Sequence, residues 1–125
     1  MKMSKYRAKK TVVDGITFDS KKEADRYIEL KQKMYDGEIW ELKLQVKFVL
    51  IPAQREADRI GKRSGVIRGR VIERECTYVA DFTYKDSNGF HVEDVKGMRD
   101  GAAYALFRVK KKMMLYFYGI RVEEV

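Results

Sequence analysis

The sequence predicts an α/β fold, a single domain in which a mixed β-sheet is flanked by helices. Two strand-like runs, 74–84 and 90–96, are separated by the turn-forming stretch Lys85–Gly89 and predict an antiparallel hairpin. Apolar residues recur at helical spacing over about 102–118, between that hairpin and a last strand-like run at 120–125. A helix that connects two strands of one sheet favours their parallel pairing, so the sheet is expected to be mixed.

The first half of the chain predicts a strand, a helix and a second strand. Residues 12–18 have strand character, broken by a turn at Asp14–Gly15. A helix is expected from about Lys21 to Asp36, because apolar residues recur at helical spacing and a glycine follows as a stop signal. Residues 44–51 predict a strand that a proline closes.

Both helices are expected to pack their apolar sides into the core. For the first helix these residues are Ala24, Tyr27, Ile28, Leu30 and Met34. For the second they are Ala103, Leu106, Phe107, Met113, Met114 and Phe117.

Three charged residues are embedded in the apolar hairpin: Asp81, Asp94 and Lys96. A two-residue turn at Asn88–Gly89 would place Asp81 opposite Lys96, whereas a loop over 86–89 would place it opposite Asp94. In both registers the three side chains share one face of the sheet. Buried charge is costly unless it is paired or bound to metal, and carboxylates suit magnesium. A magnesium site is therefore one interpretation, and an exposed face with an ion-paired Lys96 is the other.

The order Asp81, then Asp94-Val95-Lys96, resembles the D…(D/E)-x-K signature of the PD-(D/E)XK nuclease superfamily. Ala80 stands where the motif has the proline of its name. A wider likeness, through 13–24, 44–48, 80–82 and 92–97, resembles a family of small phage and prophage nuclease-like proteins and covers nearly the whole chain. The layout is also similar to archaeal Holliday-junction resolvases and to the nuclease subunit of some transposons. The resemblance implies a restriction-endonuclease-like core.

The resemblance also implies roles for individual residues. Asp81, Asp94, Lys96 and Glu23 are expected to be catalytic, with the three carboxylates holding Mg²⁺, for which Mn²⁺ can substitute. Lys96 would orient or activate the attacking water and stabilise the transition state. Gln45 matches a strand glutamine near the site of related nucleases; the alternative is a polar residue on a partly exposed strand.

Glu23 has two interpretations. In the resembling nucleases a glutamate on the first helix faces the active site, and Glu23 matches that position. It shares a helix face with Tyr27 and Leu30 by spacing. The sequence Ser20-Lys21-Lys22-Glu23 also fits a capping box, in which the glutamate has only a structural role.

Two other polar residues of the hairpin alternate to the face opposite Asp94. Glu93 is therefore expected to have a surface or helix-facing role, and His91, the only histidine, no role as general base.

The net charge of +8 indicates a polyanionic partner. Residues 1–11 form a basic N-terminal arm ahead of the nuclease-like domain at 12–125. A second basic stretch, about 53–74, is interrupted by glycines and is expected to be a mobile flap or an extended hairpin. The residues predicted to contact DNA are Lys5, Arg7, Lys9, Lys10, Arg63, Arg68, Arg70 and Arg99. A basic, solubilising surface is the alternative.

Composition excludes several classes of protein. With 125 residues and 45% apolar residues, the chain is long and apolar enough for one folded domain. The single cysteine, Cys76, cannot form an internal disulfide. A signal peptide and a run approaching the roughly 20 apolar residues of a membrane helix are both absent from the sequence, so a soluble cytoplasmic protein is expected. A phosphate-binding loop ending in Gly-Lys-Ser/Thr is also absent, so no ATP requirement is expected.

The expected function is that of a metal-dependent DNA endonuclease that hydrolyses phosphodiester bonds, with branched or recombination intermediates in a phage context as candidate substrates. The alternative is a non-catalytic DNA-binding module on a nuclease-like fold. The likeness to resolvases, which work as dimers, makes a homodimer a candidate assembly, although the sequence shows no dedicated dimer element.

Overall fold

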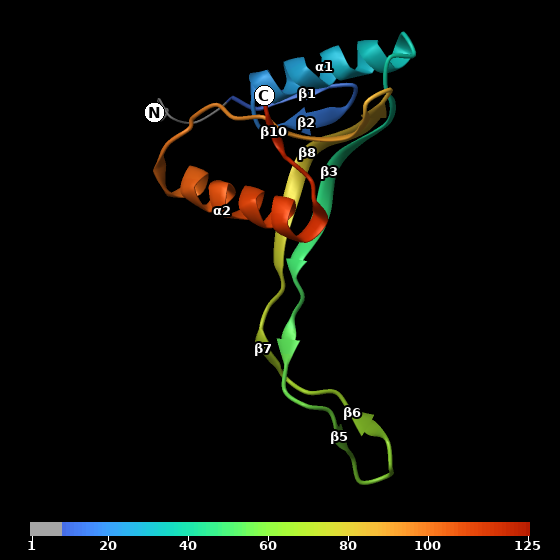
Figure 1. Ribbon diagram of the computed structural model, residues 1–125, viewed down its shortest axis with the longest axis vertical. Helices are drawn as coiled ribbons and strands as arrows, with labels where there is room; N and C mark the ends of the chain where they lie inside the picture. Colours follow the sequence, from blue (N-terminus) through green and yellow to red (C-terminus); the bar gives the residue numbers. More distant parts are fainter. Residues whose placement is uncertain (1–8) are drawn as a thin grey trace.

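Two long neighbouring strands and two helices dominate the computed structural model, which describes residues 9–125 (Figure 1). In chain order the elements are β1 (Thr11–Val13), β2 (Ile16–Phe18), α1 (Lys21–Tyr35), β3 (Trp40–Ile51), β4 (Gln54–Arg55), β5 (Arg59–Ile60), β6 (Val66–Ile67), β7 (Val71–Glu73), β8 (Cys76–Asp86), β9 (Gly89–Asp94), α2 (Gly101–Tyr118) and β10 (Glu123–Glu124).

The main sheet has four strands in the order β10-β9-β8-β3. The β3–β8 and β8–β9 pairs are antiparallel, whereas β10 lies parallel to β9 with Glu123 opposite Glu93. The helix α2 therefore connects two parallel neighbours, and the prediction of a mixed sheet in an α/β domain is confirmed. The last strand is shorter than the predicted 120–125, and β3 starts four residues earlier than the predicted 44–51.

The N-terminal segment folds as a small hairpin followed by α1. β1 and β2 pair around Asp14 and Gly15, whose φ angles of 53° and 75° are the left-handed values that a tight hairpin turn requires. The N-cap of α1 is Ser20, whose hydroxyl accepts a hydrogen bond from Glu23 N at 3.1 Å. The helix ends at Tyr35, as its glycine stop signal predicts.

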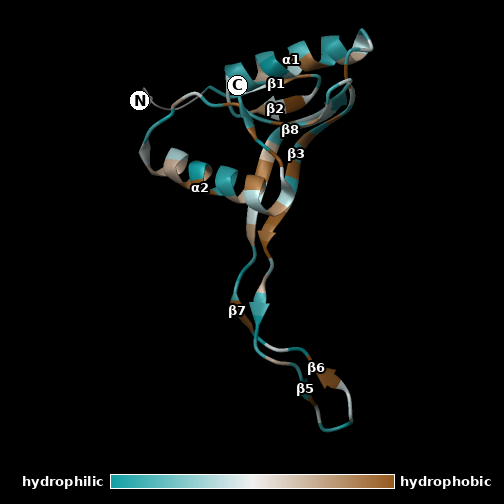
Figure 2. Ribbon diagram, viewed as in Figure 1, coloured by the Kyte–Doolittle hydropathy of each residue, from teal (hydrophilic) through white to brown (hydrophobic). Residues whose placement is uncertain are grey.

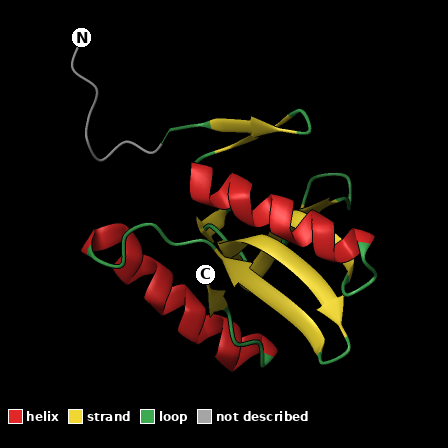
Figure 3. Cartoon of the chain, turned by 90° about the horizontal axis from the view of Figure 1, so that it is seen from above, coloured by secondary structure: helices red, strands yellow, loops and turns green. Residues whose placement is uncertain are grey.

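Two clusters of buried side chains form the core, one under each helix. Tyr27 and Leu30 of α1 pack with Phe82 and other residues at the turn end of the hairpin. Phe107 and Met114 of α2 pack with a second set that includes Tyr78, Ala80, Val92 and Val122. Neighbouring residues of β9 belong to different sides, since Val92 joins the α2 cluster and Glu93 bonds to Arg26 of α1. The two helices therefore lie on opposite sides of the sheet (Figure 3).

Parts of the predicted helix faces are wrong. Ile28 of α1 is half exposed, and on α2 Leu106 and Phe117 are more than half exposed. The predicted apolar stripe of α2 is buried only in part: Phe107 and Met114 lie in the core and Met113 packs against it, whereas Ala103, Leu106 and Phe117 face solvent. Within the part of the chain that the structure describes, no helix is long and apolar enough to cross a membrane.

The turn of the central hairpin differs from both predicted loops. Pairing continues to Asp86 opposite Gly89, which leaves Ser87–Asn88 as the turn. The side chain of Asp86 holds the turn there, because its Oδ1 accepts a hydrogen bond from Asn88 N at 2.8 Å.

This turn decides which charged residues meet. The register has Lys85 opposite Phe90 and Phe82 opposite Glu93. The pairing ends there, with Asp81 and Asp94 as the next residue on each strand, and this register rules out the alternative in which Asp81 faces Lys96.

Between β3 and β8 the chain forms a long two-stranded ribbon, residues 53–74, which we call the hairpin arm. β4 pairs with β7 and β5 pairs with β6, both antiparallel. The hairpin arm leaves the sheet and projects away from both helices (Figure 1). All of its residues are exposed except Gly61 and Gly69. Of the two predicted forms of this basic stretch, the structure has the extended hairpin.

Gly69 fastens the two strands of the hairpin arm to each other. Its N–H donates to Asp58 Oδ1 at 2.8 Å, and its carbonyl accepts from Arg55 Nη1 at 3.0 Å. A Cβ atom at this position would lie 1.7 Å from the carbonyl oxygen of Glu56, which is backbone and cannot rotate away. Only glycine fits in this arrangement.

We therefore expect Gly69→Ala to open the hairpin arm locally and leave the rest of the domain folded. Trypsin should cleave the arginine-rich hairpin arm at least about tenfold faster, because local opening exposes backbone that the fastening protects. Gly65→Ala is the matched control, since a Cβ there meets nothing within 4 Å. Equal cleavage rates for the two variants would contradict the proposed fastening.

Candidate active site

Two aspartates and a lysine come together where β9 ends and the chain leaves the sheet. Asp81 of β8 accepts a hydrogen bond from Val95 N at 2.8 Å through Oδ2. The Oδ1 of Asp94 forms an ion pair with Lys96 Nζ at 2.8 Å, and its Oδ2 accepts from Tyr78 OH at 2.7 Å. The hairpin register thus places both acids and the lysine beside one another.

Lys96 is held from two sides. Its ammonium group pairs with Asp94 and also lies 3.7 Å from the centroid of the Phe107 ring of α2. A cation over an aromatic face is attracted by the negative face of the ring. The two contacts fix the lysine at one place beside Asp94, although its side chain is still 20% exposed.

Gln45 of β3 connects α1 to the hairpin. Its Nε2 lies 3.3 Å from Glu23 Oε1 and 3.3 Å from Asp81 Oδ1. The residue has a φ of 51°, which is uncommon for a side chain with a Cβ and costs free energy. The strained residue supplies the amide that bonds to both carboxylates. The strain therefore lies at the centre of a group of acids, Glu23, Asp81 and Asp94, which we call the acidic cluster.

The position of Glu23 follows from a buried ion pair on the same helix. Arg26 donates to Glu93 through Nε at 2.8 Å and through Nη2 at 2.6 Å, and Tyr84 OH bonds to the same carboxylate. Glu93 is 2% exposed, so the helix-facing role predicted for it is confirmed and the surface role is wrong. This bidentate pair anchors α1 to β9 and holds Glu23, one turn earlier, over the acidic cluster.

The capping interpretation of Glu23 is met only in part. Ser20 accepts from the backbone N–H of Glu23, but the Glu23 carboxylate bonds to Gln45. Among the hydrogen bonds of the described residues, none joins that carboxylate to the Ser20 amide. The side chain is therefore available to the cluster while its backbone serves the cap.

Two carboxylates at this site, those of Glu23 and Asp81, have raised pKa values. Burial, followed by the charges of Asp81, Asp19 and Asp94, raises the pKa of Glu23 from 4.5 to about 7. Burial also raises the pKa of Asp81, opposed by the Val95 N–H and reinforced by the charge of Asp94. The acidic cluster thus has three carboxylates and one nearby lysine, Lys96, and a surplus of acids with raised pKa values is typical of functional sites.

The three predicted metal ligands, Asp81, Asp94 and Glu23, lie in one region, but their side chains do not converge on a single point. Among residues 9–125, no group of three His, Cys, Asp or Glu side chains is arranged to hold a metal ion. Magnesium, however, commonly takes only one or two carboxylates and keeps several waters. Asp81 and Asp94 are two such carboxylates close to each other, with Lys96 as their nearby cation and Glu23 joined to Asp81 through Gln45.

A small groove opens onto the lysine and Asp94. It has a volume of about 280 Å³ and is lined by Asp94, Lys96, Tyr78, Phe107 and Lys110, among others. One wall is therefore the apolar side of α2, and the polar groups gather at the end of β9.

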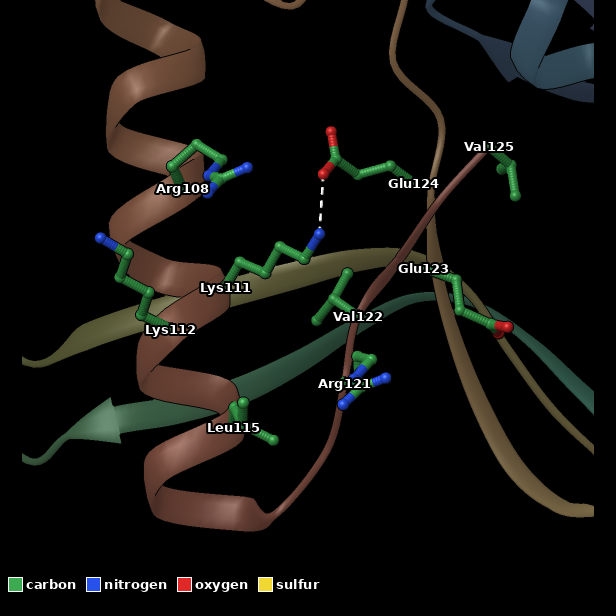
Figure 4. Close-up of a pocket in the computed structure, with 9 residues that line it drawn as sticks. All are labelled: Arg108, Lys111, Lys112, Leu115, Arg121, Val122, Glu123, Glu124 and Val125. Carbon is green, nitrogen blue, oxygen red and sulfur yellow. Dashed lines mark hydrogen bonds and ion pairs between the residues drawn. The ribbon is translucent and has the colours of Figure 1, made fainter.

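A second groove of about 660 Å³ lies on the other side of α2, against β10 (Figure 4). Its lining includes Arg108, Lys111 and Arg121, and Lys111 pairs with Glu124 at 2.7 Å. The hydrogen bond from Lys111 lowers the pKa of Glu124 to about 2. Arg99, predicted to contact DNA near the scissile bond, instead lies 3.5 Å from the same Glu124 carboxylate. This groove is separate from the acidic cluster.

The other predicted DNA-contacting residues fall into three groups. Lys5 and Arg7 lie outside the described residues. Lys9 and Lys10 are exposed just before β1. The last group, Arg63, Arg68 and Arg70, is exposed on the hairpin arm.

A family model described as "Protein of unknown function (DUF1064)" matches residues 3–123. The chain belongs to the DUF1064 family. No curated protein and no solved structure matches it. The description of the DUF1064 family assigns no chemistry, so the likeness to PD-(D/E)XK nucleases stays a prediction that rests on the residues themselves.

Two site residues of this DUF1064 protein escaped the sequence analysis. Tyr78 bonds to Asp94, and Phe107 lies under Lys96. Tyr78 is buried, and burial together with its bond to Asp94 raises the pKa of its hydroxyl. The available signal was an aromatic residue three positions before Asp81 in the same strand; Phe107 looked like an ordinary core residue of α2.

Proposed function

We propose that this chain is a metal-dependent DNA endonuclease, built on a restriction-endonuclease-like core, that hydrolyses phosphodiester bonds. The observation that supports it most is the convergence of four chemical groups from separate elements. Asp81 and Asp94 follow the last paired residues of the hairpin and lie close enough for their charges to interact, Lys96 pairs with Asp94, and Glu23 of α1 joins Asp81 through Gln45. A purely structural ion pair needs one acid and one base, whereas this cluster has three acids around one lysine.

The chain's own residues supply several parts of a hydrolysis reaction. The reaction breaks one P–O bond of the backbone and forms a new one to a water oxygen. The water loses a proton, and the oxygen that leaves must gain one. A carboxylate with a pKa of about 7, such as Glu23, can accept a proton near neutral pH.

Lys96 provides positive charge next to the position of the phosphate. Its ammonium group is fixed by Asp94 and Phe107, so it needs no reorganisation when charge develops on the phosphate oxygens. Asp81 and Asp94, with Glu23 assisting, are the residues that would hold Mg²⁺ or Mn²⁺. A bound divalent ion would supply Lewis-acid stabilisation of the phosphate and lower the pKa of a bound water.

DNA is the proposed partner because the chain has a net charge of +8, the hairpin arm has seven exposed basic residues against three acids, and Lys9 and Lys10 are exposed before β1. Branched or recombination intermediates in a phage context are the proposed substrates, and the cytoplasm the proposed compartment. A homodimer also stays a proposal, and light scattering with and without DNA measures it.

We expect cleavage to require magnesium or manganese and to stop when a chelator is added. The test is a panel of linear duplex, single strand, flap and four-way junction, each incubated with Mg²⁺, with Mn²⁺ and with excess chelator. The Asp94→Asn protein, purified in the same way, is the control for contaminating nucleases. Undiminished cutting in excess chelator would rule out the proposed chemistry.

The second candidate function is a DNA-binding module that does not cut. The contacts of Asp94 favour this alternative. Both of its carboxylate oxygens already have partners, Lys96 and Tyr78, that a metal ion would have to compete with. The same panel separates the two functions, since this alternative predicts a mobility shift of DNA without cleavage at any divalent ion concentration.

A further inference from the structure

The end of the hairpin arm presents an apolar pair to solvent. Ile60 of β5 lies directly opposite Val66 of β6, so both side chains are on one face of the ribbon. Their exposed fractions are 78% and 74%. Side chains of this size and exposure side by side at the tip of an extended element are costly to leave in water, which indicates that something covers them.

Two basic residues form the apex beside this pair. The turn closes with Gly61 N donating to Gly65 O at 2.7 Å, which leaves Lys62 and Arg63 at the outermost point. Ser64 takes the left-handed φ of 61° that completes the turn. The tip therefore combines an apolar face with two cations, within one tight loop.

The hairpin arm has almost no core of its own. A two-stranded ribbon in water is marginally stable at best, and here only Gly69 is buried. The hairpin arm stands apart from the rest of the fold, with hydrophilic and hydrophobic residues mixed along it (Figure 2). Residues 53–74 carry seven arginines and lysines against three acids. None of these cations forms an ion pair with any residue that the structure describes. This charge excess selects a polyanion, rather than a second copy of a basic chain, as the partner.

The major and minor grooves of duplex DNA are contacted by different kinds of side chain. A ribbon in the major groove reads base edges with polar side chains, and the Ile60–Val66 face offers none. Proteins that enter the minor groove commonly press apolar side chains against a base step and bend the duplex, with cations on the flanking phosphates. The composition of the tip matches the second mode.

We infer that the tip of the hairpin arm is a minor-groove wedge for duplex DNA. Ile60 and Val66 pack into the groove at one base step, Lys62 and Arg63 neutralise the phosphates on either side, and the duplex bends around the hairpin arm. The inference takes its partner class, DNA, from the proposed function, but it does not depend on cleavage. It adds a preference for deformable duplex at a position that the hairpin arm sets apart from the cleavage site (Figure 1).

The test measures binding and bending without cleavage. A duplex of about three helical turns, labelled with a dye at each end, is titrated with the full chain in excess chelator. Anisotropy gives the affinity and energy transfer gives the end-to-end distance. The wild-type protein should shorten that distance, and a netropsin-type minor-groove ligand that saturates the duplex should weaken binding at least about tenfold.

Two double variants separate the wedge from the charges. Ile60→Ser with Val66→Ser should lose the bend and at least about tenfold in affinity while the salt dependence stays as in wild type, since no charge is removed. Lys62→Ala with Arg63→Ala should flatten the slope of log affinity against log salt by about two, near 0.9 for each lost phosphate contact. Val71→Ser with Ile72→Ser is the matched control, because it removes exposed apolar residues from the base of the same hairpin arm.

Several outcomes would overturn the wedge. Wild-type affinity and bending in the Ile60 and Val66 double variant is one, and undiminished binding to the netropsin-saturated duplex is another. A change of oligomeric state in that variant, with unchanged DNA binding, would assign the apolar pair to a protein contact. A protein that bends DNA but never cuts it would refute the nuclease and leave the wedge intact, so the two proposals fail separately.

Discussion

Asp94→Asn and Lys96→Ala should each reduce DNA cleavage by at least about 100-fold. Asparagine keeps the shape of the aspartate and an acceptor for Tyr78 OH, but it removes one negative charge from a site where two opposed carboxylates are proposed to hold the metal. Alanine removes the positive charge that is held beside the phosphate, and losses of this size are typical when a preorganised group is deleted. The measurement is single-turnover cleavage of the best substrate of the panel at saturating magnesium.

Controls separate chemistry from folding. Asp25→Asn removes an exposed carboxylate from α1, and Lys85→Ala removes an exposed lysine from the same hairpin. Both should cut at the wild-type rate. Circular dichroism at the assay temperature should show Asp94→Asn and Lys96→Ala folded, and both should still bind DNA, because most of the proposed contacts come from the hairpin arm. Normal cleavage by both site variants would remove these residues from the mechanism.

Glu23→Gln should abolish most cleavage and at the same time stabilise the metal-free protein above neutral pH. The glutamine can still accept the hydrogen bond from Gln45, and the cap of α1 uses only the backbone N–H of residue 23. A residue with a purely structural role would therefore tolerate the change. A residue that accepts a proton or assists the metal would not, and we expect at least about a 100-fold loss of rate.

The stability effect follows from the raised pKa. Glu23 loses its proton near pH 4.5 in the unfolded chain but only near pH 7 in the folded protein. Between these values the folded state binds more protons than the unfolded state, so its stability falls as pH rises, and the loss persists above pH 7. Glutamine never ionises, so Glu23→Gln should melt several degrees above wild type in chelator at alkaline pH and at the same temperature below pH 4.5. Identical melting curves of Glu23→Gln and wild type at alkaline pH would show that the ionised Glu23 carboxylate does not destabilise the folded protein.

The architecture was largely predictable because its signals are local. Helical spacing and a glycine stop signal located α1, and the helix between two strand-like runs predicted the parallel pairing of β9 with β10. The exact turn of the hairpin was not predictable from loop composition, because the Asp86 side chain decides it. The width of the buried stripe of α2 was overestimated, since spacing located Phe107 and Met114 on the side that meets the sheet but did not show that Leu106 and Phe117 beside them stay exposed.

The charged residues of the candidate site were predictable from the sequence, but the residues that hold them in place were not. Asp81, Asp94, Lys96 and Glu23 stand out because charges in apolar runs need an explanation. Tyr78 and Phe107 are ordinary core residues by sequence, and only tertiary packing shows that they hold Asp94 and Lys96. The left-handed backbone of Gln45 has no sequence signal at all, because any non-glycine residue predicts the opposite sign of φ.

The pairing of β10 with β9 has a consequence for the order of folding. Val125 N bonds to Asp94 O at 2.9 Å, and Lys96 N bonds to Val125 O at 3.0 Å, so the backbone on both sides of the charged segment is held by the last residue of the sequence. Contacts between residues so distant along the chain form late, since a long loop must close first. The hairpin of β8 and β9 has its own local turn and can pair early. A chain in which β8 and β9 have paired but β10 has not yet docked would therefore lack the backbone hydrogen bonds that hold Asp94 and Lys96 from the side of Val125.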